Sequence, residues 1–253
     1  MFRLNVAKDL TQRMPHMPKI QTAMILAAGR GTRMGALTDI KPKPLMEIKG
    51  KTLLHYICQK LAHFGVTKVV VNTAYKGQMI KDALKNAPVP VVFSDEEQAL
   101  ETGGGVKNAL PLLLPNGKDG LFVINADALW DEPTRSVFER LEKAWNPDEM
   151  DMLLAIVPKS QTIGDYGKGN YFIENNRLRR IRPDEKDAPY FYMGVHILHP
   201  RIFEQSPDGF FSLRDLFDKA QSNKRLGYVI HDGSWYHVGT PEALQETNDR
   251  YMP

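Results

Sequence analysis

Cysteine is nearly absent from this 253-residue sequence, which contains only Cys58, so no intramolecular disulfide can form. That absence excludes the class of small secreted proteins that depend on disulfides for their stability. Cys58 lies among apolar residues of an expected helix, which is typical of a small buried hydrophobic side chain rather than of a nucleophile. A chain of this kind suits a reducing compartment, and we expect it in the cytoplasm.

Long hydrophobic runs are absent as well. The longest, such as residues 23–28 and 152–157, fall far short of the roughly 20 residues that span a bilayer. Residues 1–19 carry basic side chains but neither a continuous apolar core nor a small-residue cleavage signal, so we expect no secretory signal there. We expect residues 1–19 to form a loose extension, and we expect no membrane partner.

Neither sign of charge is in excess, because 33 Lys and Arg against 30 Asp and Glu give a net charge of +3. Such a balance does not favour binding to nucleic acid or to a membrane surface, so any anion site must be local. The apolar fraction of 42% and the charged fraction of 25% are ordinary for a globular protein. Nothing in these values indicates the oligomeric state.

Several common motifs are missing or incomplete. A Walker loop needs a glycine where Leu45 stands before residues 50–52, so we interpret Gly-Lys-Thr there as a turn. A dinucleotide fingerprint is disfavoured because its third glycine comes one residue late and because Asn72, not an acid, ends the second expected strand. No His or Cys cluster has zinc spacing, and Ser234 lies in no nucleophile elbow.

From residue 22 onward, short apolar runs alternate with amphipathic stretches, which is the pattern of βαβ units. The alternation predicts strands at 22–27, 66–71, 89–93, 121–125 and 152–157, and helices at 52–64, 77–85, 102–113 and 133–145. We therefore expect an α/β fold with a Rossmann-like, mostly parallel sheet and helices on both of its faces.

The last hundred residues have a different pattern. Asn175 and Asn176, a two-residue turn signal, separate residues 171–174 from residues 177–181, which predicts an antiparallel hairpin. Further strands are expected at 190–198, 226–231 and 235–238, and helices at 213–220 and 241–251. Because no linker divides the chain, we expect a single domain over residues 20–253 with a C-terminal β-rich subregion.

A glycine-rich loop follows the first expected strand, at the edge where α/β sheets bind ligands. Small residues allow the backbone to close on a polyphosphate, exposed amides form an anion site, and Arg30 and Arg33 add charged donors. A plain tight turn is the alternative. The candidate nucleotide-binding residues of this loop are Ala28, Gly29, Arg30, Gly31 and Thr32.

Residues 41–45, Lys-Pro-Lys-Pro-Leu, lie on the same long connection. The two prolines stiffen it and favour extended conformations at Lys41 and Lys43, which can hold a lysine over the loop. Solvated charge is the alternative for such a segment taken alone. Together with the preceding loop, it favours a site for an anion.

Two further junctions carry polar residues. The expected strand 121–125 ends in Asn125 and is followed by Asp127, a natural position for Mg²⁺ at the same sheet edge, although such an aspartate is often only a cap. Residues 101–105, Glu-Thr-Gly-Gly-Gly, precede a helix that Thr102 can cap. We expect the three glycines to let a base or sugar lie against the main chain.

Residues 26–34 and 42–45 together resemble the signature of the sugar-1-phosphate nucleotidylyltransferases, a Leu-Ala-Ala-Gly-x-Gly-x-Arg-Met loop followed by Pro-Lys-Pro-Leu. Residues 72–78, 101–111 and 235–241 look like one branch, the bacterial N-acetylmuramate-1-phosphate uridylyltransferases of cell-wall recycling. The resemblance covers about residues 24–244.

The resemblance implies transfer of a nucleotidyl group from a nucleoside triphosphate, with UTP favoured, to a sugar 1-phosphate, with N-acetylmuramate 1-phosphate favoured. It assigns catalysis to Arg33 and Lys43, which neutralise phosphate charge, and Mg²⁺ binding to Asp127. Mannose 1-phosphate with GTP is the nearest enzymatic alternative. A regulator that binds sugar nucleotides without turnover is the alternative from another class.

The remaining assignments are nucleotide contacts at Asn72, Thr102 and Gly103, and sugar contacts at Glu101, Asn125, Asp165, Asn170 and Gly194.

The sequence departs from the family pattern at two places. His237 replaces the usual second metal-binding aspartate, so it binds a softer ion such as Mn²⁺, contacts the sugar phosphate or acts through water. Asn170 ends a Gly-Lys-Gly-Asn segment where the family has an aspartate, so a carboxylate is lost and the identity of the sugar stays open.

Overall fold

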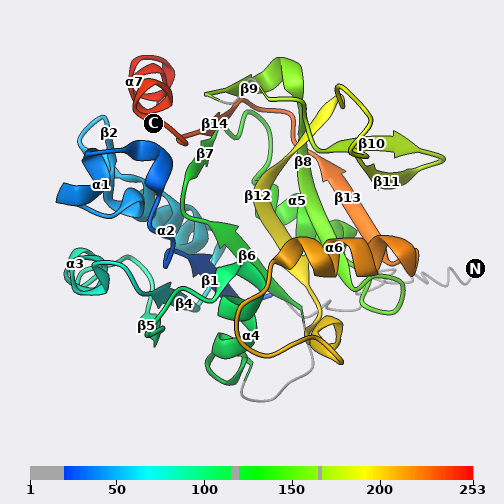
Figure 1. The fold of residues 1–253 in the computed structure, drawn as a ribbon, viewed down its shortest axis with the longest axis horizontal. Helices are drawn as coiled ribbons and strands as arrows, with labels where there is room; N and C mark the ends of the chain where they lie inside the picture. Colours follow the sequence, from blue (N-terminus) through cyan, green and yellow to red (C-terminus); the bar gives the residue numbers. More distant parts are fainter. Residues whose placement is uncertain (1–19, 115–119, 165–166, 253) are drawn as a thin grey trace, which may run out of the picture.

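A nine-stranded sheet forms the centre of the computed structural model, which describes residues 20–114, 120–164 and 167–252 (Figure 1). The order along the sheet is β11-β10-β12-β6-β1-β4-β5, with β8 paired to β12 and β13 paired to β8. These strands are β1 (Thr22–Leu26), β4 (Lys68–Thr73), β5 (Val91–Asp95), β6 (Leu121–Asn125), β8 (Met152–Pro158), β10 (Tyr171–Glu174), β11 (Arg177–Arg180), β12 (Tyr190–Leu198) and β13 (Leu226–Ile230). The expected extension at residues 1–19 lies outside the described residues.

The strands β6, β1, β4 and β5 are parallel, as the βαβ alternation predicted. In this register Leu26 pairs with Asn72 on one side and with Asn125 on the other. The carboxyl ends of three strands therefore meet at one edge, and the chain that leaves β1 passes between two asparagines.

The other half of the sheet contains the antiparallel pairs. Strand β12 runs antiparallel to both β6 and β8, and its register shifts between Tyr192 and His196. Strands β10 and β11 form the expected hairpin, with Asn175 and Asn176 at φ of 51° and 58°. The expected Rossmann-like α/β class is confirmed, with this antiparallel half beyond β6.

Alternate residues of the central strands face opposite sides of the sheet, and both sets are apolar. Helices therefore cover both faces of the sheet. Ile25 of β1 packs in a core with α2 (Leu53–Phe64) and α5 (Val137–Ala144). Met24 packs in a second core with α4 (Glu101–Leu113) and α6 (Leu213–Ser222). Both faces of β1 are buried, which explains its uninterrupted apolar sequence. The remaining helices are α1 (Leu37–Ile40), α3 (Gly77–Ala83) and α7 (Pro241–Arg250).

Several short elements were not expected. The connection between β1 and α2 contains the 3-10 helices η1 (Thr32–Met34) and η2 (Lys43–Leu45). It also contains a hairpin of β2 (Glu47–Ile48) and β3 (Lys51–Thr52). Helix α5 begins at Val137 and not at 133, because Ser136 caps it by accepting from Phe138 N.

A separate three-stranded sheet joins the expected strand β14 (Trp235–His237) to two unexpected strands, β7 (Ala128–Trp130) and β9 (Thr162–Ile163). Its antiparallel pairing of His237 with Ala128 brings the C-terminal region to the residue that follows Asp127. Within the part of the chain that the structure describes, no helix has the length and apolar character of a membrane span.

Candidate functional site

The loop after β1 is shaped by Gly31, whose φ of 69° lies in the left-handed region. A Cβ atom at Gly31 would lie 2.9 Å from Cβ of Lys43 and 3.4 Å from Cγ2 of Thr38. The loop thus packs directly on the stem of Lys43, and a side chain at position 31 would displace that stem. Cζ of Arg30, the residue before Gly31, lies 5.2 Å from the ring centroid of Tyr75.

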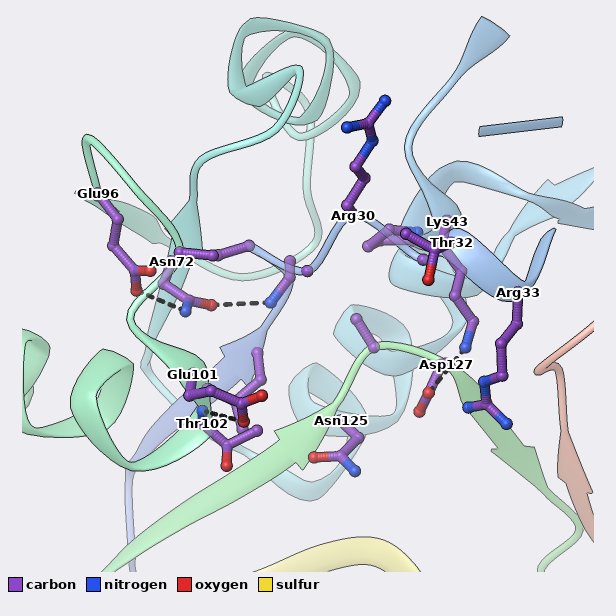
Figure 2. Close-up of a pocket in the computed structure, with 18 of the residues that line it drawn as sticks. Arg30, Thr32, Arg33, Lys43, Asn72, Glu96, Glu101, Thr102, Asn125 and Asp127 are labelled. Atoms are coloured by element: carbon purple, nitrogen blue, oxygen red, sulfur yellow. Dashed lines mark hydrogen bonds and ion pairs between the residues drawn. The ribbon is translucent and has the colours of Figure 1, made fainter. Parts of the chain in front are cut away.

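Lys43 joins this loop to the end of β6. Its Nζ lies 2.8 Å from Oδ2 of Asp127, and the residue is only 7% exposed (Figure 2). The expectation of extended backbone is confirmed at Lys41, with φ −141° and ψ 148°, but is wrong at Lys43. Lys43 begins η2, because Leu45 N donates to Pro42 O and Met46 N donates to Lys43 O.

Asp127 lies between the Lys43 ammonium and the His237 imidazole. Burial raises the pKa of Asp127, but the Lys43 ammonium and the nearby His237 outweigh that effect and hold the pKa well below its usual range. Nε2 of His237 lies 3.6 Å from Asp127 Oδ2, and its ring stacks on Trp235 at 5.3 Å. Asp127 is therefore ionised at neutral pH and accepts from Lys43.

Arg33 and His237 converge at Gly239. A Cβ atom there would lie 3.4 Å from Nη1 of Arg33 and 3.3 Å from Cε1 of His237. The lack of a side chain at Gly239 leaves room for both groups. The predicted catalytic pair, Arg33 and Lys43, is thus assembled with Asp127 from three separate segments.

These residues suit a cation whose other ligands come from a substrate. Among the described residues, no group of three or more His, Cys, Asp or Glu side chains is placed to hold a metal ion. Asp127 and His237 provide one carboxylate and one imidazole. Mg²⁺ commonly takes only one or two carboxylates and completes its shell with phosphates and water, so the Asp127 carboxylate fits such an ion, whereas the imidazole is a ligand for softer ions.

A cavity of about 490 Å³ lies over the loop and the ends of the parallel strands. Its lining includes these residues singled out from the sequence: Ala28, Gly29, Arg30, Gly31, Thr32, Arg33, Lys43, Asn72, Glu101, Thr102, Asn125 and Asp127.

The lining of this cavity also includes Glu96, Ala99 and Phe210, which the sequence did not indicate. Phe210 is 71% exposed, on backbone that Phe211 anchors to α4 through Gly103 N and Leu100 O. An exposed aromatic on fixed backbone after an Asp-Gly turn is the signal that could have identified it.

Both the oxygen and the nitrogen of the Asn72 side-chain amide form hydrogen bonds within the protein. Its Oδ1 accepts from Ala27 N at 2.8 Å, and its Nδ2 donates to Glu96 Oε1 at 2.7 Å (Figure 2). The side chain is buried at 2% exposure, so its amide fixes the start of the phosphate loop. Contact with a nucleotide stays a prediction for Asn72.

The glycines of α4 have a different role from the one expected. Cβ atoms at Gly103, Gly104 and Gly105 would clash with Phe211, with Gly209 O and with Asn72 Nδ2 respectively. The three glycines therefore permit close packing of protein segments and do not open the main chain to a ligand. Gly103 lines neither of the two cavities described here.

Thr102 does not cap α4, which is a second correction. The N-cap residue is Leu100, without a side-chain hydrogen bond, because Thr102 is already inside the helix. Oγ1 of Thr102 instead accepts from Leu213 N at 2.9 Å. The hydroxyl thereby ties the first turn of α6 to the first turn of α4.

A second cavity, of about 680 Å³, adjoins the first and shares Glu101, Thr102 and Asn125 with it. Of the predicted sugar contacts, Asn170 also lines it, with Oδ1 accepting from Tyr192 N at 2.9 Å. Gly194 does not line it. Gly194 has a φ of 82°, and a Cβ atom added to it would lie 3.0 Å from Cβ of Asn125. Gly194 therefore packs directly against the Asn125 side chain. Asp165 lies outside the described residues.

Comparison of the sequence with known proteins gives consistent matches. The profile of the nucleotidyl transferase family matches residues 22–252. The chain is 39% identical to the N-acetylmuramate alpha-1-phosphate uridylyltransferase of Caulobacter vibrioides over 236 residues, covering 91% of this chain and 96% of the relative. It is 32% identical to the protein of the same name from Neisseria meningitidis serogroup B, covering 88% and 95%.

Solved structures with the same fold include a UDP-glucose pyrophosphorylase complexed with UDP-glucose, at a TM-score of 0.75, 20% identity and coverage of 92% of this chain and 98% of that one. The inositol-1-phosphate CTP transferase from T. maritima matches at a TM-score of 0.72 and 17% identity, covering 94% and 100%. At these identities the likeness establishes the fold alone.

Proposed function

Because this chain belongs to the nucleotidyl transferase family, we propose that it transfers the uridylyl group of UTP to N-acetylmuramate 1-phosphate in cell-wall recycling, with release of pyrophosphate. The observation that carries the proposal is the junction of two cavities at Asn125, beside the cluster of Arg33, Lys43 and Asp127. One cavity suits the triphosphate and the other suits the sugar.

The reaction is an in-line displacement at phosphorus. A phosphate oxygen of the sugar 1-phosphate forms a bond to the α-phosphorus of the nucleotide, and the bond from that phosphorus to the bridging oxygen of the β-phosphate breaks. Pyrophosphate leaves with the electron pair of that bond. No protein nucleophile is needed, so the chain acts by alignment and by neutralising charge.

Each group of the chain has a role in that neutralisation. The amides of the loop from Ala28 to Thr32 and the Arg33 guanidinium bind phosphate oxygens. The Lys43 ammonium, held by Asp127 at 2.8 Å, faces the oxygens on which charge accumulates as the bond to pyrophosphate breaks. Because Lys43 is buried, its charge acts in a medium of low polarity and is worth more than in water.

We propose that Asp127, with His237 beside it, holds Mg²⁺ together with substrate phosphates, and that Mn²⁺ can replace it. When bound, such an ion neutralises phosphate charge and orients the triphosphate. A nucleotide substrate and a single buried cysteine also support a cytoplasmic location for the enzyme.

The test is pyrophosphate release by the full chain with Mg²⁺ or Mn²⁺. UTP, GTP, CTP, ATP and dTTP are each combined with the 1-phosphates of N-acetylmuramate, N-acetylglucosamine, glucose and mannose. We expect a kcat/KM at least tenfold higher for UTP with N-acetylmuramate 1-phosphate than for any other pair. A preference for GTP with mannose 1-phosphate, or nucleotide-sugar binding without pyrophosphate release from any pair, would overturn the proposal.

A further inference from the structure

The second cavity carries an excess of positive charge. Among the residues that the structure describes, its lining contains one acidic residue, Glu101, and four basic residues, Lys168, Arg180, Arg182 and Arg214. A neutral sugar would need hydrogen-bonding groups of both kinds but no such excess of cations. The composition of the lining therefore points to a ligand with a negative group of its own.

The basic residues differ in whether their charge is already neutralised. Arg180 donates through Nε to Asp218 Oδ1 at 2.7 Å, and its Nη2 contacts the other oxygen of the same carboxylate. Arg214 is four residues before Asp218 on α6, the spacing at which the two would otherwise pair. Because Arg180 already forms an ion pair with the Asp218 carboxylate, the exposed Arg214 has no carboxylate partner among the residues that the structure describes.

The position of Arg214 is fixed by its neighbours. Its backbone N donates to the capping hydroxyl of Ser212, and the preceding Leu213 N donates to Thr102, which both cavities share. Burial raises the pKa of the Tyr171 phenol; the charge of Arg180 opposes that rise, that of Asp218 adds to it, and that of Arg214 opposes it. Both guanidiniums thus act on one wall of the cavity.

Arg182 enters the same cavity from the segment that follows β11. Its backbone N donates to Glu185, and that carboxylate is held by two nitrogens of Arg179, at 2.8 Å each. The charge of Arg182 helps to lower the pKa of Glu174 and Glu185, but its exposed guanidinium lies within ion-pair distance of no carboxylate within residues 20–114, 120–164 and 167–252. Two unpaired guanidiniums, from α6 and from the loop after β11, therefore line one space.

We propose that Arg214, with Arg182, binds the carboxylate of the lactyl ether of N-acetylmuramate 1-phosphate and so selects this sugar over N-acetylglucosamine 1-phosphate. The inference rests on the proposed function, because it identifies what the second cavity recognises. The two sugars differ only in that ether, and the planar fork of arginine matches a carboxylate bidentately. A site built around a charged group discriminates strongly against an analogue that lacks it.

The experiment compares kcat/KM for the two sugar phosphates with UTP, for the wild type, Arg214→Gln, Arg182→Gln and the double variant. Arg177→Gln is the matched control, because Arg177 is an exposed arginine of β11 that does not line the cavity. We expect Arg214→Gln to lower the ratio of kcat/KM for N-acetylmuramate over N-acetylglucosamine 1-phosphate about 10- to 100-fold, mainly through KM. The double variant should lower it further, and Arg214→Lys should recover part of it.

A ratio in the double variant equal to that of the wild type would overturn the inference while leaving the proposed function in place. A wild type that does not use N-acetylmuramate 1-phosphate at all would overturn both, so the two failures are distinguishable. A ratio that falls equally in Arg177→Gln would assign the effect to net charge and would also overturn the role of Arg214.

Discussion

Nζ of Lys43 lies 2.8 Å from Oδ2 of Asp127, although the two residues are 84 positions apart in the sequence. This contact joins the connection between β1 and α2 to the end of β6. The two groups serve each other. Asp127 gives the buried ammonium a counter-charge, and the ammonium keeps the carboxylate ionised. The pair therefore presents a fixed cation and an anion that can hold a metal, side by side in the first cavity.

Lys43→Ala should lower kcat for pyrophosphate release about 10²- to 10³-fold, because it removes a positioned cation from the site where charge develops. Lys41→Ala is the matched control. Lys41 pairs with Glu47 on the exterior at 2.7 Å, and its loss should change kcat less than twofold. Turnover of Lys43→Ala within a few-fold of the wild type would remove Lys43 from the catalytic machinery.

Gly31→Ala should lower both the free energy of unfolding and kcat. The alanine would be strained at φ 69° by about 1–3 kcal/mol, and its Cβ would push against the stem of Lys43. Gly35→Ala separates the two effects, since Gly35 also has a positive φ, of 57°, but no heavy atom beyond its chain neighbours lies within 4 Å of the position that its Cβ would take. Urea denaturation should show a loss in both variants, whereas a large loss of kcat should appear only in Gly31→Ala. Equal losses of kcat would contradict the proposed contact.

The sequence predicted those parts of the fold that local pattern determines. The apolar run of β1 and the helical spacing in α2 depend on nearest neighbours, and each was found within a few residues of its expected place. The loop from Ala28 to Arg33 and the lysine at position 43 were also identified, because glycine, arginine and proline restrict the backbone wherever they occur.

Contacts between distant segments could not be predicted in the same way. His237 reaches Asp127 only because β14 pairs with β7. A strand was expected at 235–238, but no strand was expected at β7, and local pattern does not show which strands pair. The glycines at 103–105 were expected to receive a base or sugar, and only the packing of distant residues such as Phe211 and Gly209 against α4 shows that they permit close packing. Arg214 carries no local signal that marks it as a site residue, and its place in the lining of the second cavity follows from the packing of α6.

Asn72→Asp should lower the free energy of unfolding at pH 7 by about 2 kcal/mol or more. The change places a carboxylate where Nδ2 now donates to Glu96 Oε1 at 2.7 Å, so two acidic groups would face each other in a buried position. Urea denaturation measures the loss. Adding Glu96→Gln restores a donor to the pair and should recover most of the stability, and a double variant as unstable as the single one would contradict this assignment.

His237→Asp should shift metal preference from Mn²⁺ toward Mg²⁺, because a carboxylate is a harder ligand than an imidazole. The ratio of kcat/KM with the two ions measures the shift, and a titration of Mn²⁺ followed by electron paramagnetic resonance measures binding without turnover. His63→Asp, at an exposed position on α2, is the control for added charge. An unchanged ratio together with unchanged Mn²⁺ affinity would remove His237 from the metal site.

Two buried histidines should make the fold sensitive to mild acid. Burial lowers the pKa of His196 from 6.5 to about 3 and that of His231 from 6.5 to about 4. Between pH 6.5 and 4 the unfolded chain therefore binds up to two more protons at these positions than the folded chain does, with the largest difference near the middle of this window. The free energy of unfolding should fall as the pH falls through this window, by up to about 2.7 kcal/mol per pH unit from the pair.

Urea denaturation at pH 7, 6 and 5 tests this expectation through the slope of stability against pH. His231→Leu removes one of the two groups, so its slope should be about half that of the wild type, even if its stability at pH 7 differs. His63→Leu removes an exposed histidine and should leave the slope as it is. A His231→Leu slope equal to that of the wild type would show that His231 takes up a proton without unfolding, so burial would not be the source of the acid sensitivity.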